Sequence, residues 1–211
     1  MSTFDDLPPC EALAEIARDF HCRGWMAGTA GNLSRRDPQR PHAFWITASG
    51  KPKGRLSAED FLLIDVASGA VLATPVEANR PSAETSIHQA IYTLFPEAHA
   101  CLHVHTVDAY LATTRHAPEG LELPLPPLEM IKGFDIWVEN PQVSLPLFDN
   151  WLEVPRIAEE IRARFEKSKP AVPALMIRNH GVTVWGKNLQ QAYNRLEILE
   201  FIMSYLARLP D

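Results

Sequence analysis

Two histidines separated by one residue, His103 and His105, form the clearest chemical feature of this 211-residue chain. They end an apolar run that begins at Ala100 and favours a strand, and side chains two positions apart on a strand point to the same face. Both imidazoles can therefore reach one ion. Neutral imidazole suits Zn²⁺, and a catalytic zinc site usually has three protein ligands and one open position. The pair predicts a metal site that needs a third ligand, although two half-exposed histidines at a strand end would show the same spacing.

His180 is the candidate third ligand. It lies in Arg178-Asn179-His180-Gly181, a polar turn between two apolar segments, 174–177 and 182–185, that favour strands. A turn held by two strands can present a ligand from rigid supports. The alternative is that Asn179 and Gly181 supply the turn geometry and that His180 is solvated. The remaining histidines have no comparable grouping and are expected to be structural: His21, His42, His88, His99 and His116.

Two carboxylates are candidate general acids or bases. Glu84 falls in the first turn of an expected helix, where the helix dipole alone would favour an acid. Glu129 precedes Met130 and Ile131, which suggest burial, and burial would raise the pKa of a carboxyl group toward a useful value. Position along the chain does not decide between the two.

Three short polar loops are candidate sites for an anion, because backbone N–H groups, hydroxyls and helix N-termini bind phosphate. They are Gly31-Asn32, the segment from Ser49 through Gly50 to Lys53, and Ser82 at a helix start. Each also has a structural interpretation as a turn, a solvated lysine pair or a helix cap. The glycine and lysine spacing of a Walker loop is absent.

The elements that must position these residues are helices interleaved with strands. Apolar residues recur at helical spacing over 13–20, 87–94, 157–165 and 192–206. Strand formers gather over 44–47, 61–66, 70–74, 100–105, 174–177 and 182–185, and the second and third of these are expected to pair as a hairpin. Residues 117–149 are rich in proline and lack a clean period, which predicts a long irregular excursion with one helical turn over 128–132.

Composition limits the class of protein. Twenty Lys and Arg against 26 Asp and Glu give a net charge of −6, which excludes a generally basic nucleic-acid binder. A hydrophobic fraction of 46% indicates an ordinary globular core, and no break in composition divides the chain. Neither a signal peptide nor a membrane span is expected. Cys10, Cys22 and Cys101 form no disulfide framework, so free thiols and a cytoplasmic location are expected.

Five blocks, in their order and spacing, resemble the class II aldolase/adducin family over nearly the whole chain: Gly31–Ser34, Thr47–Gly50, Arg80–Glu84, His103–His105 and Arg178–Gly181. The resemblance implies one domain over residues 1–211, a three-layer α/β/α sandwich with a largely antiparallel central sheet. It implies a homotetramer with active sites near subunit boundaries. It also implies one Zn²⁺ per subunit on His103, His105 and His180. The implied phosphate-binding residues are Gly31, Asn32, Ser49, Gly50 and Ser82, with Lys53 as an addition.

Within the family, Arg80–Thr85 and especially Leu128–Gly133 are most similar to the dehydratases of methionine salvage. That similarity implies zinc-dependent dehydration of 5-methylthioribulose 1-phosphate, a small-molecule substrate, with Glu129 as the first candidate acid/base and Glu84 as the second. The alternative is retro-aldol cleavage of a ketose 1-phosphate, which Ala83 weakens because it replaces the second serine of the aldolase block. A non-catalytic module like the adducin head is disfavoured by the three histidines. Nucleic-acid and membrane partners are not expected.

Overall fold

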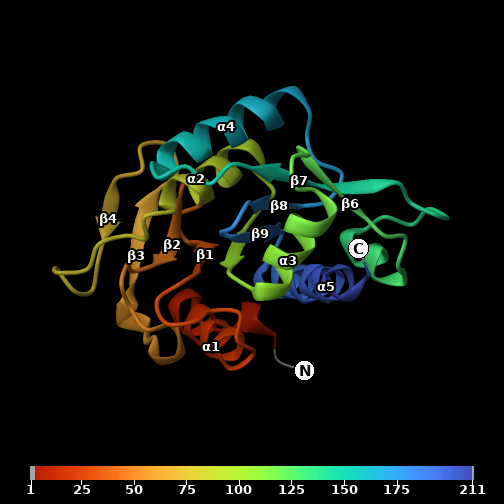
Figure 1. The fold of residues 1–211 in the computed structure, drawn as a ribbon. Helices are drawn as coiled ribbons and strands as arrows, with labels where there is room; N and C mark the ends of the chain where they lie inside the picture. Colours follow the sequence, from red (N-terminus) through yellow and green to blue (C-terminus); the bar gives the residue numbers. More distant parts are fainter. Residues whose placement is uncertain (1–2, 211) are drawn as a thin grey trace.

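A nine-stranded sheet runs through the computed structural model, which describes residues 3–210 (Figure 1). The strand order is β4-β3-β2-β1-β5-β9-β8-β7-β6, and every neighbouring pair is antiparallel except β7 with β8. The strands are β1 (Asn32–Arg36), β2 (Ala43–Thr47), β3 (Phe61–Asp65), β4 (Val71–Ala73), β5 (Ala100–Val104), β6 (Glu122–Leu125), β7 (Val143–Phe148), β8 (Ala174–Ile177) and β9 (Gly181–Gly186). The largely antiparallel central sheet expected from the sequence is confirmed.

Helices cover both faces of the sheet. In Figure 1, α2 (Thr85–Leu94) and α4 (Val154–Lys167) lie above it, and α1 (Pro9–Cys22) and α5 (Leu189–Arg208) lie below it. Helix α3 (Val107–His116) packs against α5. Four short 3₁₀ helices complete the described elements: η1 (Phe4–Asp6), η2 (Lys53–Arg55), η3 (Ala58–Asp60) and η4 (Glu129–Phe134). Two buried apolar clusters, one on each face of the sheet, separate the three layers.

The apolar stripes that predict the helices are the surfaces that the helices bury. Leu13, Ile16 and Phe20 of α1 are fully buried against one face, and Ile157 and Ile161 of α4 are fully buried against the other. Each such side chain contributes about 1.5–3 kcal/mol by leaving water. Strand β5 is buried at all five positions, as expected for a central strand with helices on both faces. The strand that carries the histidine pair is therefore held from both sides.

Two parts of the fold differ from the sequence expectation. Helix α3 is absent from the sequence expectation, because small residues, Ala109, Ala112 and Thr113, form its buried side in place of a stripe of large apolar residues. Its local signals are at its ends: the Thr106 side chain accepts a hydrogen bond from the Ala109 N–H, Asp108 lies in the first turn, and Arg115 and His116 lie in the last. Residues 117–149 are not irregular throughout, since they contain the strands β6 and β7, whereas the single helical turn expected over 128–132 is present as η4. Pro124 lies in the edge strand β6, the position in a sheet where proline is tolerated.

Two general expectations concern thiols and membranes. Cys10, Cys22 and Cys101 are free, as expected. Within residues 3–210, the helices lack the combination of length and apolar character needed to cross a bilayer.

One acidic side chain is buried in α5 without an ionic partner in the described chain. Glu200 is only 4% exposed; its Oε2 accepts a hydrogen bond from Thr106 Oγ1 at 2.8 Å, whereas its Oε1 has none. Burial, with a smaller contribution from Asp108, raises the pKa of Glu200 from 4.5 to about 8. The folded protein therefore keeps a proton that the unfolded chain releases, so Glu200 lowers stability progressively as pH rises from 4.5 to 8.

We expect Glu200→Gln to stabilise the protein increasingly as pH rises between 4.5 and 8, because glutamine has no charge to suppress. The Tm difference between variant and parent, measured across that range, should grow with pH and then level off. Glu159→Gln, which changes an exposed carboxylate on α4, is the matched control and should give a flat difference. A flat difference for Glu200→Gln as well would contradict the buried neutral acid.

Candidate metal centre

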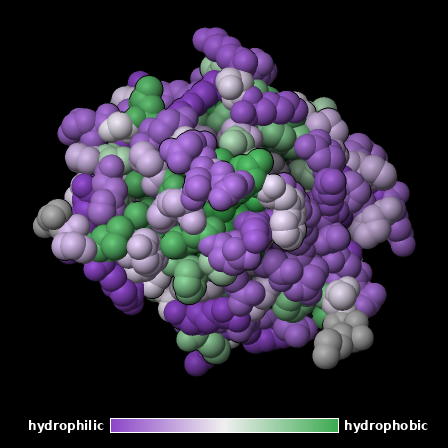
Figure 2. Space-filling view, turned by 90° about the vertical axis from the view of Figure 1, so that its right-hand side faces the viewer, coloured by the Kyte–Doolittle hydropathy of each residue, from purple (hydrophilic) through white to green (hydrophobic). Residues whose placement is uncertain are grey.

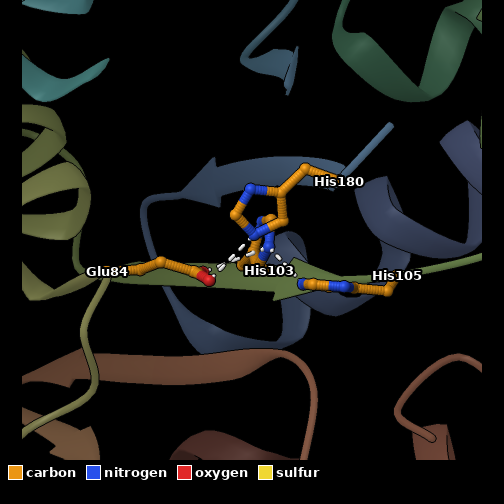
Figure 3. A group of neighbouring side chains, drawn as sticks. All are labelled: Glu84, His103, His105 and His180. Carbon is orange, nitrogen blue, oxygen red and sulfur yellow. Dashed lines mark hydrogen bonds and ion pairs between the residues drawn. The ribbon is translucent and has the colours of Figure 1, made fainter. Parts of the chain in front are cut away.

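Four side chains from separate parts of the sequence converge on one point (Figure 3). His103 lies near the end of β5, His105 just beyond it, His180 in the turn before β9, and Glu84 at the start of α2. Each offers one ligand atom, and these four atoms lie within 4.8 Å of one another. His103 Nε2 is 2.9 Å from His105 Nε2 and 3.1 Å from Glu84 Oε2, and His180 Nε2 is 2.9 Å from Glu84 Oε1. The structure thus brings the three predicted histidines together and adds Glu84 to them.

The opposite nitrogen of each imidazole meets a group of the protein. Nδ1 of His103 is 2.9 Å from Thr183 Oγ1, and Nδ1 of His180 is 3.1 Å from Asn150 Oδ1. His105 Nδ1 lies 3.4 Å from the Tyr110 hydroxyl. Metal-binding histidines characteristically use one ring nitrogen for the ion and the other for such an orienting partner.

The donor set fits a divalent transition metal. Three imidazole nitrogens and one carboxylate suit zinc, and related metals accept the same ligands. Burial lowers the pKa of His103 to about 4 and that of His105 to about 3, so both rings are neutral near pH 7, the form that binds metal.

Glu84 supplies the negative charge of the centre. Burial alone would raise its pKa, but His103, His180 and the hydrogen bond from Asn32 outweigh burial and hold the pKa well below its usual range. The side chain is therefore a carboxylate at neutral pH. One buried negative charge facing neutral imidazole nitrogens favours a cation.

Backbone geometry brings His180 close to β5. Asn179 has a φ of 51°, in the left-handed region that asparagine tolerates, and it reverses the chain just before His180. Gly181 then allows close approach: a Cβ at this position would lie 2.2 Å from Val104 O and 2.9 Å from His103 Cε1. The Tyr110 hydroxyl donates to His180 O at 2.6 Å and holds the turn.

The three predicted anion loops also meet beside this centre. The Lys53 N–H donates to Gly28 O at 3.0 Å, the Ser49 N–H to Arg80 O at 2.8 Å, and the Ser82 N–H to Thr47 O at 3.2 Å. These bonds join the loop before β1, the loop after β2 and the loop before α2.

The candidate anion-binding residues differ in their exposure and in how far their donors are already hydrogen-bonded within the protein. The Lys53 ammonium is buried and donates to Thr29 O at 2.8 Å and Lys51 O at 3.2 Å; burial lowers its pKa, and Glu84 opposes that shift. Asn32 Nδ2 donates to Glu84 Oε2 at 2.5 Å. Gly31 has a φ of 81°, and a Cβ there would lie 2.9 Å from His103 O. Ser49 and Gly50 are exposed, and Ser82 is half-buried.

Of the two predicted catalytic carboxylates, Glu129 lies outside the cluster. Its side chain is 81% exposed and accepts a 2.7 Å hydrogen bond from Lys132 Nζ. The expected burial of Glu129 is therefore wrong for the single chain. Because a 3₁₀ helix has three residues per turn, Glu129 and Lys132 share the outer side of η4, whereas Ile131 and Phe134 enter the core. A catalytic role for Glu129 stays a prediction.

Sequence reasoning missed the residues behind the centre. Thr183 faces His103 only through the register of β5 with β9, and Tyr110 belongs to the unexpected helix α3. Asn150 follows β7 and lies just beyond 117–149, the region expected to be irregular. Only the proximity of Thr183 to His180 in sequence offered a signal, and that signal is weak.

We expect Gly181→Ala to weaken metal binding, probed with added Zn²⁺, by about 10-fold or more, because the methyl group must push β9 away from Val104 O and displace His180. Affinity is measured by competition with a chelator, and circular dichroism of the metal-free variant checks that the fold is retained. Unchanged affinity in a folded variant would mean that the turn relaxes without moving the ligand.

Comparison with known proteins identifies the family of this chain. Residues 11–206 match the family model described as the class II aldolase and adducin N-terminal domain. The chain is 55% identical to a methylthioribulose-1-phosphate dehydratase of Microcystis aeruginosa, over 94% of each chain, and 43% identical to one of Leptospira biflexa, over 97% of this chain and 99% of the relative.

Solved structures agree on the fold. YgbL of Escherichia coli superposes with a TM-score of 0.78 at 24% identity, covering 94% of this chain and 88% of its own. An L-fuculose 1-phosphate aldolase gives 0.72 at 24%, covering 94% and 89%. The expected three-layer fold is confirmed, and the chain belongs to the class II aldolase and adducin N-terminal domain family.

Proposed function

We propose that this chain is a hydro-lyase that dehydrates 5-methylthioribulose 1-phosphate to 5-methylthio-2,3-dioxopentyl 1-phosphate in methionine salvage, with residues 1–211 acting as one domain. The observation that carries the proposal is 55% identity, over 94% of both chains, to a relative named for this reaction. The convergence of three histidines and Glu84 supports it, because the reaction needs an electrophile beside a sugar carbonyl.

We assign one Zn²⁺ per subunit to His103, His105 and His180, with Glu84 as a further ligand or close partner. Bound zinc would supply Lewis-acid polarisation of the substrate carbonyl and hold its neighbouring oxygens. Thr183, Asn150 and Tyr110 orient the three rings from behind. Nearly complete burial of His103 limits water in the centre and strengthens its electrostatic interactions.

The two candidate carboxylates suit different tasks. Glu84 has a pKa far below neutral, which makes it a weak proton acceptor but a strong ligand and orienting group. Glu129 remains the first candidate acid/base. Its carboxylate would take the proton from C3, the C4–oxygen bond would break, and the same carboxyl would return the proton so that water leaves. The resulting enol then tautomerises to the diketone, and Glu84 is the second candidate for this task.

Because Glu129 is exposed and lies outside the metal-binding cluster, we propose that it serves the site of a neighbouring copy in a homotetramer. Exposed apolar groups lie near it in sequence: Leu121 and Trp137 are each 73% exposed and Val138 is 61% exposed. Figure 2 shows hydrophobic side chains gathered within a polar surround on this side of the molecule, where β6 lies. Such patches on a protein surface typically mark contacts with other chains.

The substrate phosphate is assigned to the joined loops beside Glu84. Ser49, Gly50 and Ser82 offer donors at the surface, whereas Lys53 supplies positive charge from within the loop. Gly31 and Asn32 form the wall next to His103.

Retro-aldol cleavage is the second candidate function, favoured by the position of Glu84 inside the cluster. Both reactions develop negative charge on C3 beside the carbonyl. Dehydration removes the C3 proton and expels the C4 hydroxyl, whereas cleavage removes the proton of the C4 hydroxyl, breaks the C3–C4 bond and returns a proton to C3. A non-catalytic binding role like that of the adducin head would not require the cluster of three histidines.

Incubation with methylthioribulose 1-phosphate separates the two reactions by product mass. We expect one product that is lighter than the substrate by one water and that retains every carbon atom. Formation of dihydroxyacetone phosphate would instead establish cleavage, and an unchanged substrate with zinc-loaded protein would refute both.

Glu129→Gln should retain zinc and lower kcat by about 10²–10⁴-fold, because it removes proton transfer without removing a metal ligand. Metal analysis and steady-state kinetics measure the two effects. Loss of zinc in this variant would make Glu129 a structural ligand.

The contribution of Glu129 to a neighbouring site predicts complementation. Glu129→Gln mixed with His180→Ala and reassembled should recover activity, since some sites then combine an intact metal centre with an intact Glu129. Each variant incubated alone is the control. A mixture that stays inactive despite subunit exchange would place both residues in the same site of one chain.

A further inference from the structure

A continuous line of hydrogen bonds runs from Glu84 into the interior of the protein. Asn32 Nδ2 lies 2.5 Å from Glu84 Oε2, and His88 Nε2 lies 2.5 Å from Asn32 Oδ1. Ser34 Oγ lies 2.6 Å from His88 Nδ1 and 2.8 Å from the Tyr92 hydroxyl. Asn32 and Tyr92 are 2% exposed, and Ser34 and His88 are completely buried.

The line is formed by two elements whose repeats match in length. Asn32 and Ser34 are two residues apart on β1 and share a face, while Glu84, His88 and Tyr92 are four residues apart at and within α2 and share a side. Four residues of helix rise about 6 Å, and two residues of strand rise about 6.6 Å. The side chains of β1 and those of α2 therefore have nearly the same spacing, and each strand side chain lies between two helix side chains.

The chemistry of the groups determines the direction of every bond. A carboxylate only accepts, so the Asn32 amide nitrogen donates to Glu84 and leaves the amide oxygen to accept from the His88 Nε2–H. Burial lowers the pKa of His88 to about 4, so the ring has one proton near neutral pH, and its Nδ1 must accept from the Ser34 hydroxyl. The competing acceptor for that hydroxyl, Cys101 O, is farther away at 3.4 Å. Tyr92 in turn donates to Ser34.

We propose that His88 is a positioning residue, kept in its Nε2–H tautomer by Ser34, that fixes the Asn32 amide so that it donates to Glu84. Without the His88 donor, the amide is free to turn its oxygen toward the carboxylate, which would repel it. Glu84 would then lose its orientation toward the metal ligands. The activity consequence rests on the proposed function, but the tautomer and the metal affinity do not.

Two substitutions of His88 distinguish the role of Nε2 from that of Nδ1. His88→Gln places an amide near the Nε2 position and can still donate to Asn32, whereas His88→Asn reaches only the Nδ1 position and cannot. We expect His88→Asn to weaken zinc affinity, measured by chelator competition, by about 10–100-fold, and His88→Gln to restore most of it. Both replace a buried ring and should lower Tm alike. Equal zinc affinities in the two variants would overturn the proposal.

The tautomer is measured directly. In metal-free protein labelled with ¹⁵N-histidine, the His88 signal, assigned by its loss in His88→Asn, should show a protonated Nε2 and an unprotonated Nδ1 near neutral pH. A proton on Nδ1, or on both nitrogens, would overturn the proposed direction.

Steady-state kinetics test whether the hydrogen bonds from His88 to Glu84 affect catalysis. In zinc-loaded protein, His88→Asn should lower kcat more than it changes KM, and His88→Gln should recover kcat. If the parent protein does not dehydrate the substrate, the proposed function fails while the tautomer and zinc measurements still decide the role of His88. If the parent is active and the two variants have equal kcat, the positioning role fails.

Discussion

The buried carboxylate of Glu84 is the constraint that the rest of the structure must satisfy. A charge removed from water is costly unless donors and opposite charges replace the lost solvation. Here the replacements come from Asn32, His103 and His180, which belong to three different parts of the chain. The fold must therefore hold β1, β5, the turn before β9 and the start of α2 within hydrogen-bonding distance.

The sheet meets that requirement by placing one row of residues across three neighbouring strands. Asn32 pairs with His103 between β1 and β5, and His103 pairs with Thr183 between β5 and β9. A slip of one residue in either pairing would turn the histidine away from its partners, because alternate strand residues face opposite sides. Such a slip is also unfavourable for packing, since it would exchange the side chains that β5 places in the two apolar clusters. The packing that stabilises the fold thus also sets the geometry of the site.

The two candidate acids, Glu84 and Glu129, have different surroundings in this fold. Glu84 lies among imidazoles and amide donors that keep it ionised, so its environment suits a ligand. Glu129 lies on the outer side of η4, where another chain can cover it. In the proposed homotetramer, this exposed carboxylate would meet the candidate metal centre of a neighbouring copy.

The sequence by itself determined the type of chemistry and most of the elements. His103 and His105 predict a shared ligand face because strand periodicity is local, and the helices appear as apolar stripes for the same reason. The resemblance of five short blocks was sufficient for the family, and the family model and the solved structures agree with it. Tertiary structure alone decided that Glu84 joins the histidines, that Glu129 stands apart, and that His88, expected to be structural, lies directly behind Asn32. These facts depend on strand register, on the packing of α2 against β1 and on the packing of η4 against α5. All three arise from contacts between residues far apart in the chain and leave no periodic trace in the sequence.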